Sequence, residues 1–460
     1  MTDVSAVLKN AKHLHFVGIG GSGMFPLVEV MRKEGYTITG SDVLEGSIID
    51  SERAMGIDVH IGHDARLVEG ADAVVVTAAL LAGNPEVARA QELGIPIIER
   101  AELLGYVSGM FNHSICISGT HGKTTTTSMV VSMLLLGGLD PSAVVGGKLP
   151  LIHGYGRRGE SDYMVIEACE FKDTFLHLTP DYAVILDVDA DHLDYFGTLE
   201  GVEHSFNRFA ELAHTAVIAN KDDANTVTAL GGVDKPVIWF GEDESCDYVI
   251  HDIKREDHAF YSFKLKDKNG EIGSFKLNVP GRHNVHNGCA AAVCALMCGL
   301  NAEQIQAGFD SFKGAGRRFE ILGEYNGITF ADDYAHHPAE LEVTINAAKE
   351  MGYERVIAVF QPFTYSRTKQ HLDEFARVLS LADRVVMTEI MGSREVNTYN
   401  IYTADLAAKI PGAEWFNTFE EVCDRCLEIA RPGDLVITLG CGDIYKAAHM
   451  MVDRCKALNS

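Results

Sequence analysis

The sequence predicts an α/β protein with a Rossmann-like N-terminal domain, a central P-loop ATPase-type domain with a mixed sheet, and a Rossmann-like, doubly wound C-terminal domain. First, 460 residues exceed what one hydrophobic core normally holds. Second, apolar runs end in glycine-rich turns near Gly18 and again near Gly119. Third, a new series of apolar runs, each followed by polar residues, begins at Val356. The expected domains span residues 1–111, 112–314 and 315–460.

Composition and charge restrict the classes of partner. Hydrophobic residues make up 47% of the chain and charged residues 23%, which is typical of a soluble globular protein. The net charge of −26 argues against nucleic acid and membrane partners, because both attract a basic face. The N-terminus has no signal-peptide pattern, and the ten cysteines, including the pair Cys423 and Cys426, are best explained as buried thiols of a reducing compartment. We therefore expect a cytoplasmic protein.

A phosphate-binding loop is the strongest motif in the chain. An apolar run ends at Ser118, and a helical pattern follows the loop. Glycines let backbone N–H groups face an anion, and the helix N-terminus adds its positive dipole end. Lys123 would contact the terminal phosphates of a nucleoside triphosphate, and Thr124 would bind Mg²⁺. The alternative is an ordinary glycine-rich turn with an exposed lysine. The candidate loop residues are Gly119, Thr120, His121, Gly122, Lys123, Thr124 and Thr125.

The glycine-rich turn of the first domain fits a dinucleotide fingerprint. Gly18, Gly20 and Gly23 follow a short apolar run, and Asp42 ends the next run about twenty residues further on. Many ligands that carry phosphate use the same loop. By itself, the pattern therefore leaves the nucleotide open.

Two apolar runs of the central domain end in possible metal ligands. One run is followed by Glu167, and the other by an acidic stretch that contains His192. Because the carboxyl ends of parallel strands meet at one edge of a sheet, Thr124, Glu167 and His192 should converge. Oxygen ligands suit Mg²⁺, and a set with a histidine would also accept Mn²⁺. The alternative is that Glu167 and His192 only cap strand ends.

Polar residues also gather around the expected third domain. Asn284 and Asn287 lie three residues apart at a helix start, where they would either cap the helix or bind a base edge. Residues 313–316 read as a hinge, and the densest polar cluster in the later part of the chain spans residues 332–338. Two histidines beside two aspartates make this cluster a candidate site.

Together these motifs resemble those of the Mur ligases, from about residue 12 to residue 455. The motifs that carry the resemblance span residues 18–24, 119–125, 167–170, 191–194, 281–287, 316–319, 332–338 and 360–362. The resemblance implies an ATP-dependent ligase that joins L-alanine to the lactyl carboxylate of UDP-N-acetylmuramate through an acyl phosphate, in peptidoglycan precursor synthesis. It implies ATP and Mg²⁺ as cofactors, small-molecule substrates, and a monomer or weak homodimer.

The resemblance also implies a role for individual residues. The UDP part of the substrate would lie on Gly18, Gly20, Gly21, Ser22, Gly23 and Asp42. ATP would contact the phosphate loop, Asn284, Asn287, Arg318 and Asp333, with Mg²⁺ held by Thr124, Glu167 and His192. The catalytic residues would be Lys123, His337 and Arg367, with Tyr334 and His336 in the substrate site. In this scheme His337 takes the proton from the incoming amine.

Three residues depart from the family pattern. Cys169, Asp187 and Phe363 stand where Asp, Asn and a histidine are commoner, so the metal ligands are kept while the amino-acid pocket loses a polar contact.

Three other functions compete with this one. The nearest alternative is a ligase that attaches a whole peptide to the same UDP-sugar. An NAD-dependent oxidoreductase and a non-catalytic nucleotide switch are more distant alternatives.

Overall fold

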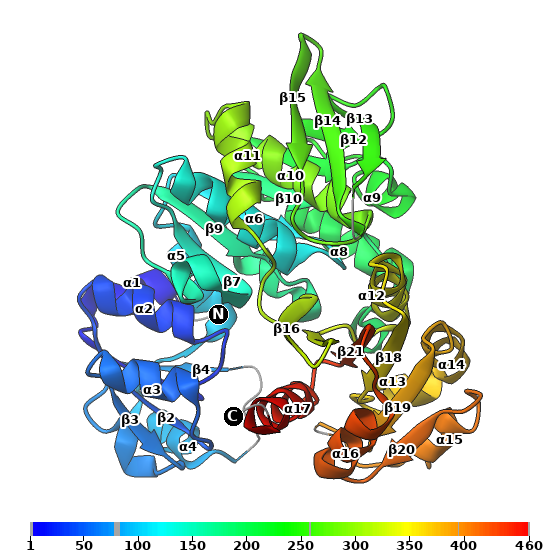
Figure 1. Cartoon of the computed structure of the whole chain (residues 1–460). Coiled ribbons are helices and arrows are strands. Elements are labelled where there is room, and N and C mark those ends of the chain that lie inside the picture. Colours follow the sequence, from blue (N-terminus) through cyan, green and yellow to red (C-terminus); the bar gives the residue numbers. More distant parts are fainter. Residues whose placement is uncertain (1–2, 78–82, 257–258, 394, 459–460) are drawn as a thin grey trace. The chain divides into compact units, whose positions relative to one another are not determined.

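The computed structural model describes residues 3–77, 83–256, 259–393 and 395–458 (Figure 1). Contacts between residues divide the chain into two compact units. The first unit comprises residues 1–251, 265–273 and 286–311, and the second comprises residues 252–264, 274–285 and 312–460. Three β-sheets follow one another along the chain, as the sequence predicts.

The N-terminal sheet is a parallel sheet with the strand order β3-β2-β1-β4-β5. The order reverses at β1, so the loop that follows β1 lies at the topological switch point, where ligands bind in such sheets. The strands are β1 (His13–Val17), β2 (Thr37–Asp42), β3 (Asp58–Ile61), β4 (Ala73–Val76) and β5 (Ile97–Glu99). The helices are α1 (Val4–Asn10), α2 (Phe25–Lys33), α3 (Ser47–Ala54), η1 (Ala65–Val68), α4 (Pro85–Leu93) and α5 (Arg100–Ser108).

The central sheet is mixed and has the order β15-β14-β13-β12-β11-β10-β6-β9-β7-β8. Strands β6, β7 and β9 to β12 pair in parallel, whereas β8 runs antiparallel to β7. The strands are β6 (His113–Ser118), β7 (Ser142–Leu149), β8 (Gly154–Arg157), β9 (Tyr163–Glu167), β10 (Tyr182–Ile185), β11 (Ala216–Asn220), β12 (Val237–Gly241), β13 (Tyr248–Arg255), β14 (Tyr261–Asp267) and β15 (Gly270–Lys276). The helices are α6 (Lys123–Leu136), η2 (Pro150–Ile152), η3 (Phe171–His177), α7 (Leu193–Phe196), α8 (Leu199–Glu211), α9 (Ala224–Ala229), α10 (His283–Met297) and α11 (Ala302–Ser311).

The C-terminal sheet has the order β16-β17-β21-β18-β19-β20, with β16 antiparallel to β17 and the remaining pairs parallel. Both faces are buried, because Ala358 and Phe360 of β18 belong to one apolar core and Ile357 and Val359 to another. The strands are β16 (Glu320–Tyr325), β17 (Ile328–Asp333), β18 (Arg355–Phe360), β19 (Arg384–Thr388), β20 (Glu414–Phe416) and β21 (Asp434–Leu439). The helices are α12 (Pro338–Glu350), α13 (Tyr365–Gln370), α14 (Leu372–Leu379), α15 (Thr403–Ala407), α16 (Phe419–Ile429) and α17 (Tyr445–Leu458).

Within the first unit, the N-terminal sheet and the central sheet share one apolar core. Phe16 of β1 and Ile166 of β9 belong to the same cluster of buried side chains. Helix α5 approaches η3 so closely that a Cβ atom at Gly105 would lie 2.2 Å from the carbonyl oxygen of His177. Because the two sheets pack this closely, the glycine-rich loops that follow β1 and β6 belong to the same compact unit. Among the described residues, no helix combines the length and the apolar character needed to cross a membrane.

A buried carboxyl group in the N-terminal domain yields a stability prediction. Both carboxyl oxygens of Glu52 in α3 are buried and lack a hydrogen-bond partner. Burial, with the nearby charge of Asp42 adding to it, raises the pKa of Glu52 from 4.5 to about 8. The folded chain therefore holds a proton that the unfolded chain releases between these two pH values. The free energy of unfolding should thus fall as the pH rises through that window.

The substitution Glu52→Leu is expected to raise stability at pH 8 by about 2 kcal/mol, because leucine carries neither the buried charge nor a polar group without a hydrogen-bond partner. At pH 4, where Glu52 is protonated in both states, the gain should shrink. The measurement is the unfolding midpoint of both chains at the two pH values. Asp58→Asn, at an exposed position of β3, is the matched control. An equal gain at both pH values would contradict the explanation.

Candidate active site

The phosphate loop connects β6 to α6, and both of its glycines are required by geometry. Gly119 has a φ of +148° and Gly122 a φ of +79°, both in the region that favours glycine. A Cβ atom at Gly122 would lie 2.3 Å from Oδ1 of Asn287, and one at Gly119 would lie 2.8 Å from Oδ1 of Asp187. The predicted strand, tight turn and helix are therefore present, and Asn287 lies beside the loop.

Lys123 folds back over this loop. Its Nζ donates to the carbonyl oxygen of Thr120 at 3.0 Å and pairs with Glu170 Oε2 at 3.0 Å. Burial alone would lower the pKa of Lys123, but the charge of Glu170, the hydrogen bond to it and the nearby charge of Glu167 together outweigh burial and hold the pKa above its usual value. The side chain is thus a fixed positive charge at the start of α6. Phosphate oxygens at the loop would meet this charge together with the helix N-terminus.

Asp187 braces the phosphate loop, a role that the sequence analysis missed. The backbone N–H of His121 donates to Oδ1 of Asp187 at 2.8 Å, and the N–H of Thr120 donates to its carbonyl oxygen at 3.2 Å. Burial raises the pKa of Asp187 to about 6, although the nearby His121 opposes the shift. Asp187 follows β10, which neighbours β6 in the sheet. Its place after that strand was visible in the sequence, but its partners were not.

The structure brings together two of the three predicted metal ligands. The Thr124 hydroxyl donates to Oε1 of Glu167 at 3.0 Å, and Oε2 of Glu167 accepts the N–H of Gly146 at 2.7 Å. A Cβ atom at Gly146 would lie 2.2 Å from Glu167, so this glycine makes room for the carboxylate. A hydroxyl and a carboxylate are hard oxygen donors, and this pair fits Mg²⁺. The ring centroid of His192 lies 4.6 Å from that of Phe171, its Nε2 is near Asp191, and its place among the metal ligands stays a prediction.

The two asparagines of α10 have different surroundings. Asn287 lies against Gly122, as described above. Asn284 donates from Nδ2 to the carbonyl oxygen of Pro280 at 2.7 Å, which holds the turn before the helix. This donation to a carbonyl oxygen is not a helix cap, so both interpretations of the pair, a cap and a base contact, stay predictions.

The glycine loop of the N-terminal domain is held by β2. The N–H groups of Gly18 and Ile19 donate to the carbonyl oxygen of Ser41 at 2.8 and 3.0 Å. The N–H of Gly20 donates to Oδ2 of Asp42 at 3.0 Å, so the predicted acid shapes the loop itself. Gly21 and Ser22 are exposed at its tip. The sequence analysis missed Arg100, whose Nη1 would lie 3.4 Å from a Cβ atom at Gly23 and which adds a positive charge beside the loop.

A buried polar network contacts Ser41, which holds this loop, and the sequence analysis did not predict it. Glu86 is fully buried and accepts from His15 at 2.9 Å, from His63 at 2.9 Å and from Ser41 at 2.8 Å. Burial would raise the pKa of Glu86, but these hydrogen bonds outweigh it and lower the pKa. The network positions Ser41, whose carbonyl oxygen holds Gly18. The two histidines and the acid are far apart in sequence, so no local pattern marks them.

The predicted polar cluster of the C-terminal domain forms at the end of β17. Oδ2 of Asp333 accepts the N–H of Phe319 at 2.7 Å, and Oδ1 accepts the N–H of Ala335 at 2.8 Å. Burial raises the pKa of Asp333 to about 6, with the charge of Arg318 opposing the shift. The guanidinium of Arg318 lies 5.2 Å from the ring centroid of Tyr334. Arg318, Asp333 and Tyr334 therefore lie close together, and their roles toward nucleotide and substrate stay predictions.

Of the remaining predicted residues of this domain, His336 and His337 lie in the loop before α12, and Arg367 lies on a helix. His336 pairs through Nδ1 with Glu340 at 3.1 Å and has its ring centroid 6.4 Å from that of Phe363. His337 precedes α12, and its ring centroid is 5.1 Å from that of His371. Arg367 lies on α13, and its positive charge opposes the rise that burial causes in the pKa of the Cys441 thiol.

Three family models cover the three sheets in order. They are the Mur ligase family, catalytic domain, at residues 13–111, the Mur ligase middle domain at residues 117–295, and the Mur ligase, glutamate ligase domain, at residues 317–442. The chain belongs to the Mur ligase family. The resemblance inferred from the motifs is therefore confirmed.

Three relatives show which members of the Mur ligase family this chain is similar to. The UDP-N-acetylmuramate–L-alanine ligase of Caldanaerobacter subterraneus subsp. tengcongensis is 41% identical over 98% of this chain and 99% of its own length. The crystal structure of the UDP-N-acetylmuramate-alanine ligase MurC from Thermotoga maritima has a TM-score of 0.83 at 26% identity and covers 97% of this chain and 99% of its own. A murein peptide ligase from Psychrobacter arcticus shares the fold, with a TM-score of 0.76 at 24% identity over 96% of this chain and 98% of its own.

Proposed function

We propose that this chain joins L-alanine to the lactyl carboxylate of UDP-N-acetylmuramate in an ATP-dependent reaction of peptidoglycan precursor synthesis. The observation that carries the proposal is the phosphate loop, where the charged Lys123 and the pair of Thr124 and Glu167 lie at the start of one helix. The identity of 41% over almost the whole length of a ligase with this activity supports the choice of substrates.

The reaction requires two substitution steps, each of which forms one bond and breaks another. The lactyl carboxylate oxygen attacks the γ-phosphorus of ATP, so that an acyl phosphate forms and ADP leaves. The neutral amine of alanine then attacks the acyl carbon, the carbon–nitrogen bond forms, and the bond to phosphate breaks. The ammonium of alanine must first lose a proton to a base, because it has no free electron pair.

The phosphate loop accounts for the first step. Backbone N–H groups and Lys123 neutralise charge on the transferring phosphoryl group. Thr124 and Glu167 would hold Mg²⁺, with His192 proposed as a further ligand and Mn²⁺ as a substitute. The ion would supply positive charge to the phosphate oxygens. Asn287, which lies against Gly122, is proposed to meet the adenine side together with Asn284.

The other two domains are proposed to hold the remaining parts of the substrates. Their boundaries are proposed at residues 111/112 and 314/315. The UDP part would lie on the glycine loop formed by Gly18, Gly20, Gly21, Ser22 and Gly23, beside Asp42. Arg318 and Asp333 would contact the nucleotide, whereas Tyr334, His336, His337 and Arg367 would surround the muramate carboxylate and alanine. The partners would be small molecules, and the chain would act in the cytoplasm as a monomer or weak homodimer.

Phosphate release from ATP and Mg²⁺ tests the activity. With UDP-N-acetylmuramate present, we expect release only when L-alanine is added, together with a new amide product identified by mass. If a tripeptide supports release and alanine does not, the chain has the activity named for the Psychrobacter arcticus relative instead. Nucleotide binding without release on either substrate would favour a nucleotide switch and overturn the proposal.

His337 is proposed as the base, and its variant should have a distinctive pH profile. His337→Ala is expected to lower kcat about a hundredfold at neutral pH, because general base catalysis typically contributes that much. The loss should become smaller at high pH, where more of the alanine is already a free amine. The measurement is kcat against pH with saturating substrates. His449→Ala, at an exposed position of α17, is the control. An unchanged rate and pH profile would remove His337 from this role.

A further inference from the structure

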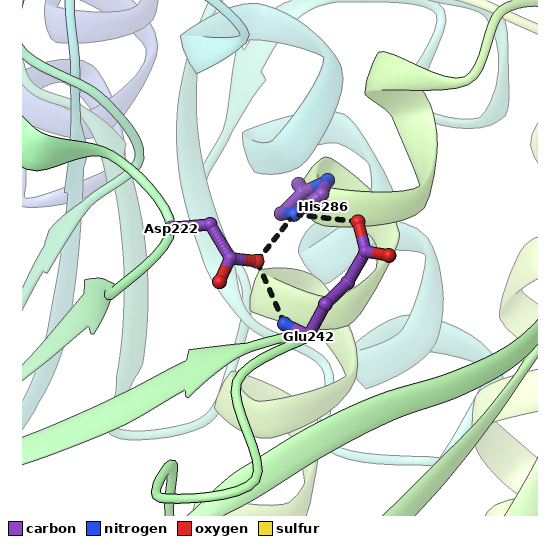
Figure 2. Close-up of side chains that lie close together, drawn as sticks. All are labelled: Asp222, Glu242 and His286. Atoms are coloured by element: carbon purple, nitrogen blue, oxygen red, sulfur yellow. Dashed lines mark hydrogen bonds and ion pairs between the residues drawn. The ribbon is translucent and has the colours of Figure 1, made fainter.

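A second cluster of ligand atoms lies at the same edge of the central sheet as the phosphate loop. Asp222 follows β11, Glu242 follows β12, and these strands are parallel neighbours. The third member, His286, belongs to the first turn of α10. Figure 2 shows the imidazole directed toward both carboxylates. The sequence analysis did not single out any of these residues.

The three ligand atoms are close enough to share one metal ion. Nε2 of His286 lies 2.9 Å from Oδ2 of Asp222 and 3.7 Å from Oε1 of Glu242, and the three ligand atoms all lie within 4.8 Å of one another. Ligand atoms that share one tetrahedral zinc ion are roughly 3.4 Å apart, given bonds of about 2.1 Å. Small side-chain rotations therefore place all three atoms around a single ion.

The backbone orients the acids toward this point. Oδ2 of Asp222 accepts the N–H of Glu242 at 2.7 Å. Gly241 leaves room for this carboxylate, since a Cβ atom there would lie 2.8 Å from both of its oxygens, and the φ of +156° also favours glycine. A backbone hydrogen bond to a ligating carboxylate is the usual support of a metal ligand.

The ligand types select the ion. One imidazole and two carboxylates suit Zn²⁺ and related first-row divalent ions, whereas Mg²⁺ prefers oxygen alone. The two carboxylates balance the charge of a divalent cation, and the side chains are partly exposed, at 27%, 39% and 20% for Asp222, Glu242 and His286. A hydrated ion can therefore reach the site and keep a water as its fourth ligand. The chain's net charge of −26 adds a general attraction for cations.

We propose that Asp222, Glu242 and His286 form a structural site for a zinc-type divalent cation, separate from the ion at Thr124 and Glu167. The ion would tie the first turn of α10 to the ends of β11 and β12. Because His286 immediately precedes Asn287, which lies against Gly122, the ion would also hold α10 beside the phosphate loop. The proposal does not depend on the identity of the substrates.

Zinc binding to the chelator-treated full-length chain tests the proposal. Zn²⁺ is titrated in the presence of a chromogenic chelator and excess Mg²⁺, which occupies the oxygen-ligand site. We expect one Zn²⁺ per chain, and at least tenfold weaker binding in His286→Gln and Glu242→Gln. Glu244→Gln makes the same charge change two residues further on, where the side chain pairs with Lys266, and should bind like the wild type.

Two further readouts show whether the ion uses these ligands. Zn²⁺ should raise the thermal unfolding midpoint of the wild type and of Glu244→Gln, but not of His286→Gln. Co²⁺ should give the visible absorption of a low-symmetry, four- or five-coordinate site in the wild type only. Equal Zn²⁺ affinity in His286→Gln and the wild type would overturn the proposal. So would the absence of Zn²⁺ binding to the folded wild type, since His286 and Asp222 would then form a simple ion pair.

Discussion

Replacing Lys123 by methionine is expected to lower kcat for ATP-dependent amide formation by about a thousandfold, the loss typical when one preorganised stabilising group is removed from a transition state. The loss has a structural cause that the contacts make explicit. The ammonium is the charged group that the structure places over the loop carbonyls, and Glu170 holds its pKa above the usual value. It therefore remains positive throughout the pH range of the reaction.

The same change should also destabilise the first unit. The side chains of Glu170 and Lys123 are only 4% and 15% exposed, so methionine would leave a buried carboxylate without its partner. Removing one partner of a buried pair typically costs about 3–5 kcal/mol. The double variant Lys123→Met with Glu170→Gln separates the two effects, because it should recover the unfolding midpoint and leave the activity low.

Lys268→Met is the control for this experiment, because Lys268 lies in the exposed turn between β14 and β15. The measurements are kcat from phosphate release and the thermal unfolding midpoint of each variant. If the double variant recovers activity together with stability, Lys123 acts only through folding, and its assignment to phosphoryl transfer is wrong.

Glu167→Gln is expected to give the second largest effect, a loss of about a hundredfold in kcat/KM with a shift in the Mg²⁺ dependence. Glutamine has the shape of glutamate, and its Oε1 can still accept a hydrogen bond from Thr124 or Gly146. The fold should therefore be kept. What is lost is the negative charge that Mg²⁺ prefers in a ligand, so roughly tenfold or more Mg²⁺ should be needed for half-maximal rate.

The measurement is the initial rate against Mg²⁺ concentration at saturating ATP and substrates. Glu160→Gln is the control, because this glutamate is 79% exposed and pairs only with Lys33 among the ion pairs of the described residues. A lower rate with an unchanged Mg²⁺ requirement would mean that Glu167 positions the loop around Thr124 instead of holding the ion.

The predictions from the sequence succeeded where one rule connects local pattern to position in space. A short apolar run, glycines and a lysine before a helical pattern predict the loop around Lys123, because few backbone paths join a strand to a helix so tightly. Likewise, Thr124 follows strand β6 and Glu167 ends strand β9. These two residues meet because β6 and β9 are parallel neighbours and end at one edge of the sheet. The family motifs added the substrate classes, which such local rules do not reach.

The predictions were incomplete for several groups whose partners are distant in the sequence and are not marked by a motif. The pairing of Lys123 with Glu170 and the brace that Asp187 provides to the loop depend on which strands become neighbours. For Asn284, helical spacing allowed a base contact or a cap. The structure shows a different local contact, in which Nδ2 donates to the carbonyl oxygen of Pro280. The hydrogen-bond partners of such groups are properties of the packed chain.

By itself, the sequence determined the three-domain α/β architecture, the phosphate loop, the family and the residues at the strand ends, because each of these is encoded in contiguous segments. Only the tertiary structure decided which side chains share a site. It joined Glu86 to His15 and His63 behind the glycine loop, and it placed His286 beside Asp222 and Glu242. The physical reason is that strand order and helix packing bring these groups within a few ångströms of one another, and neither is written in the spacing of residues along the chain.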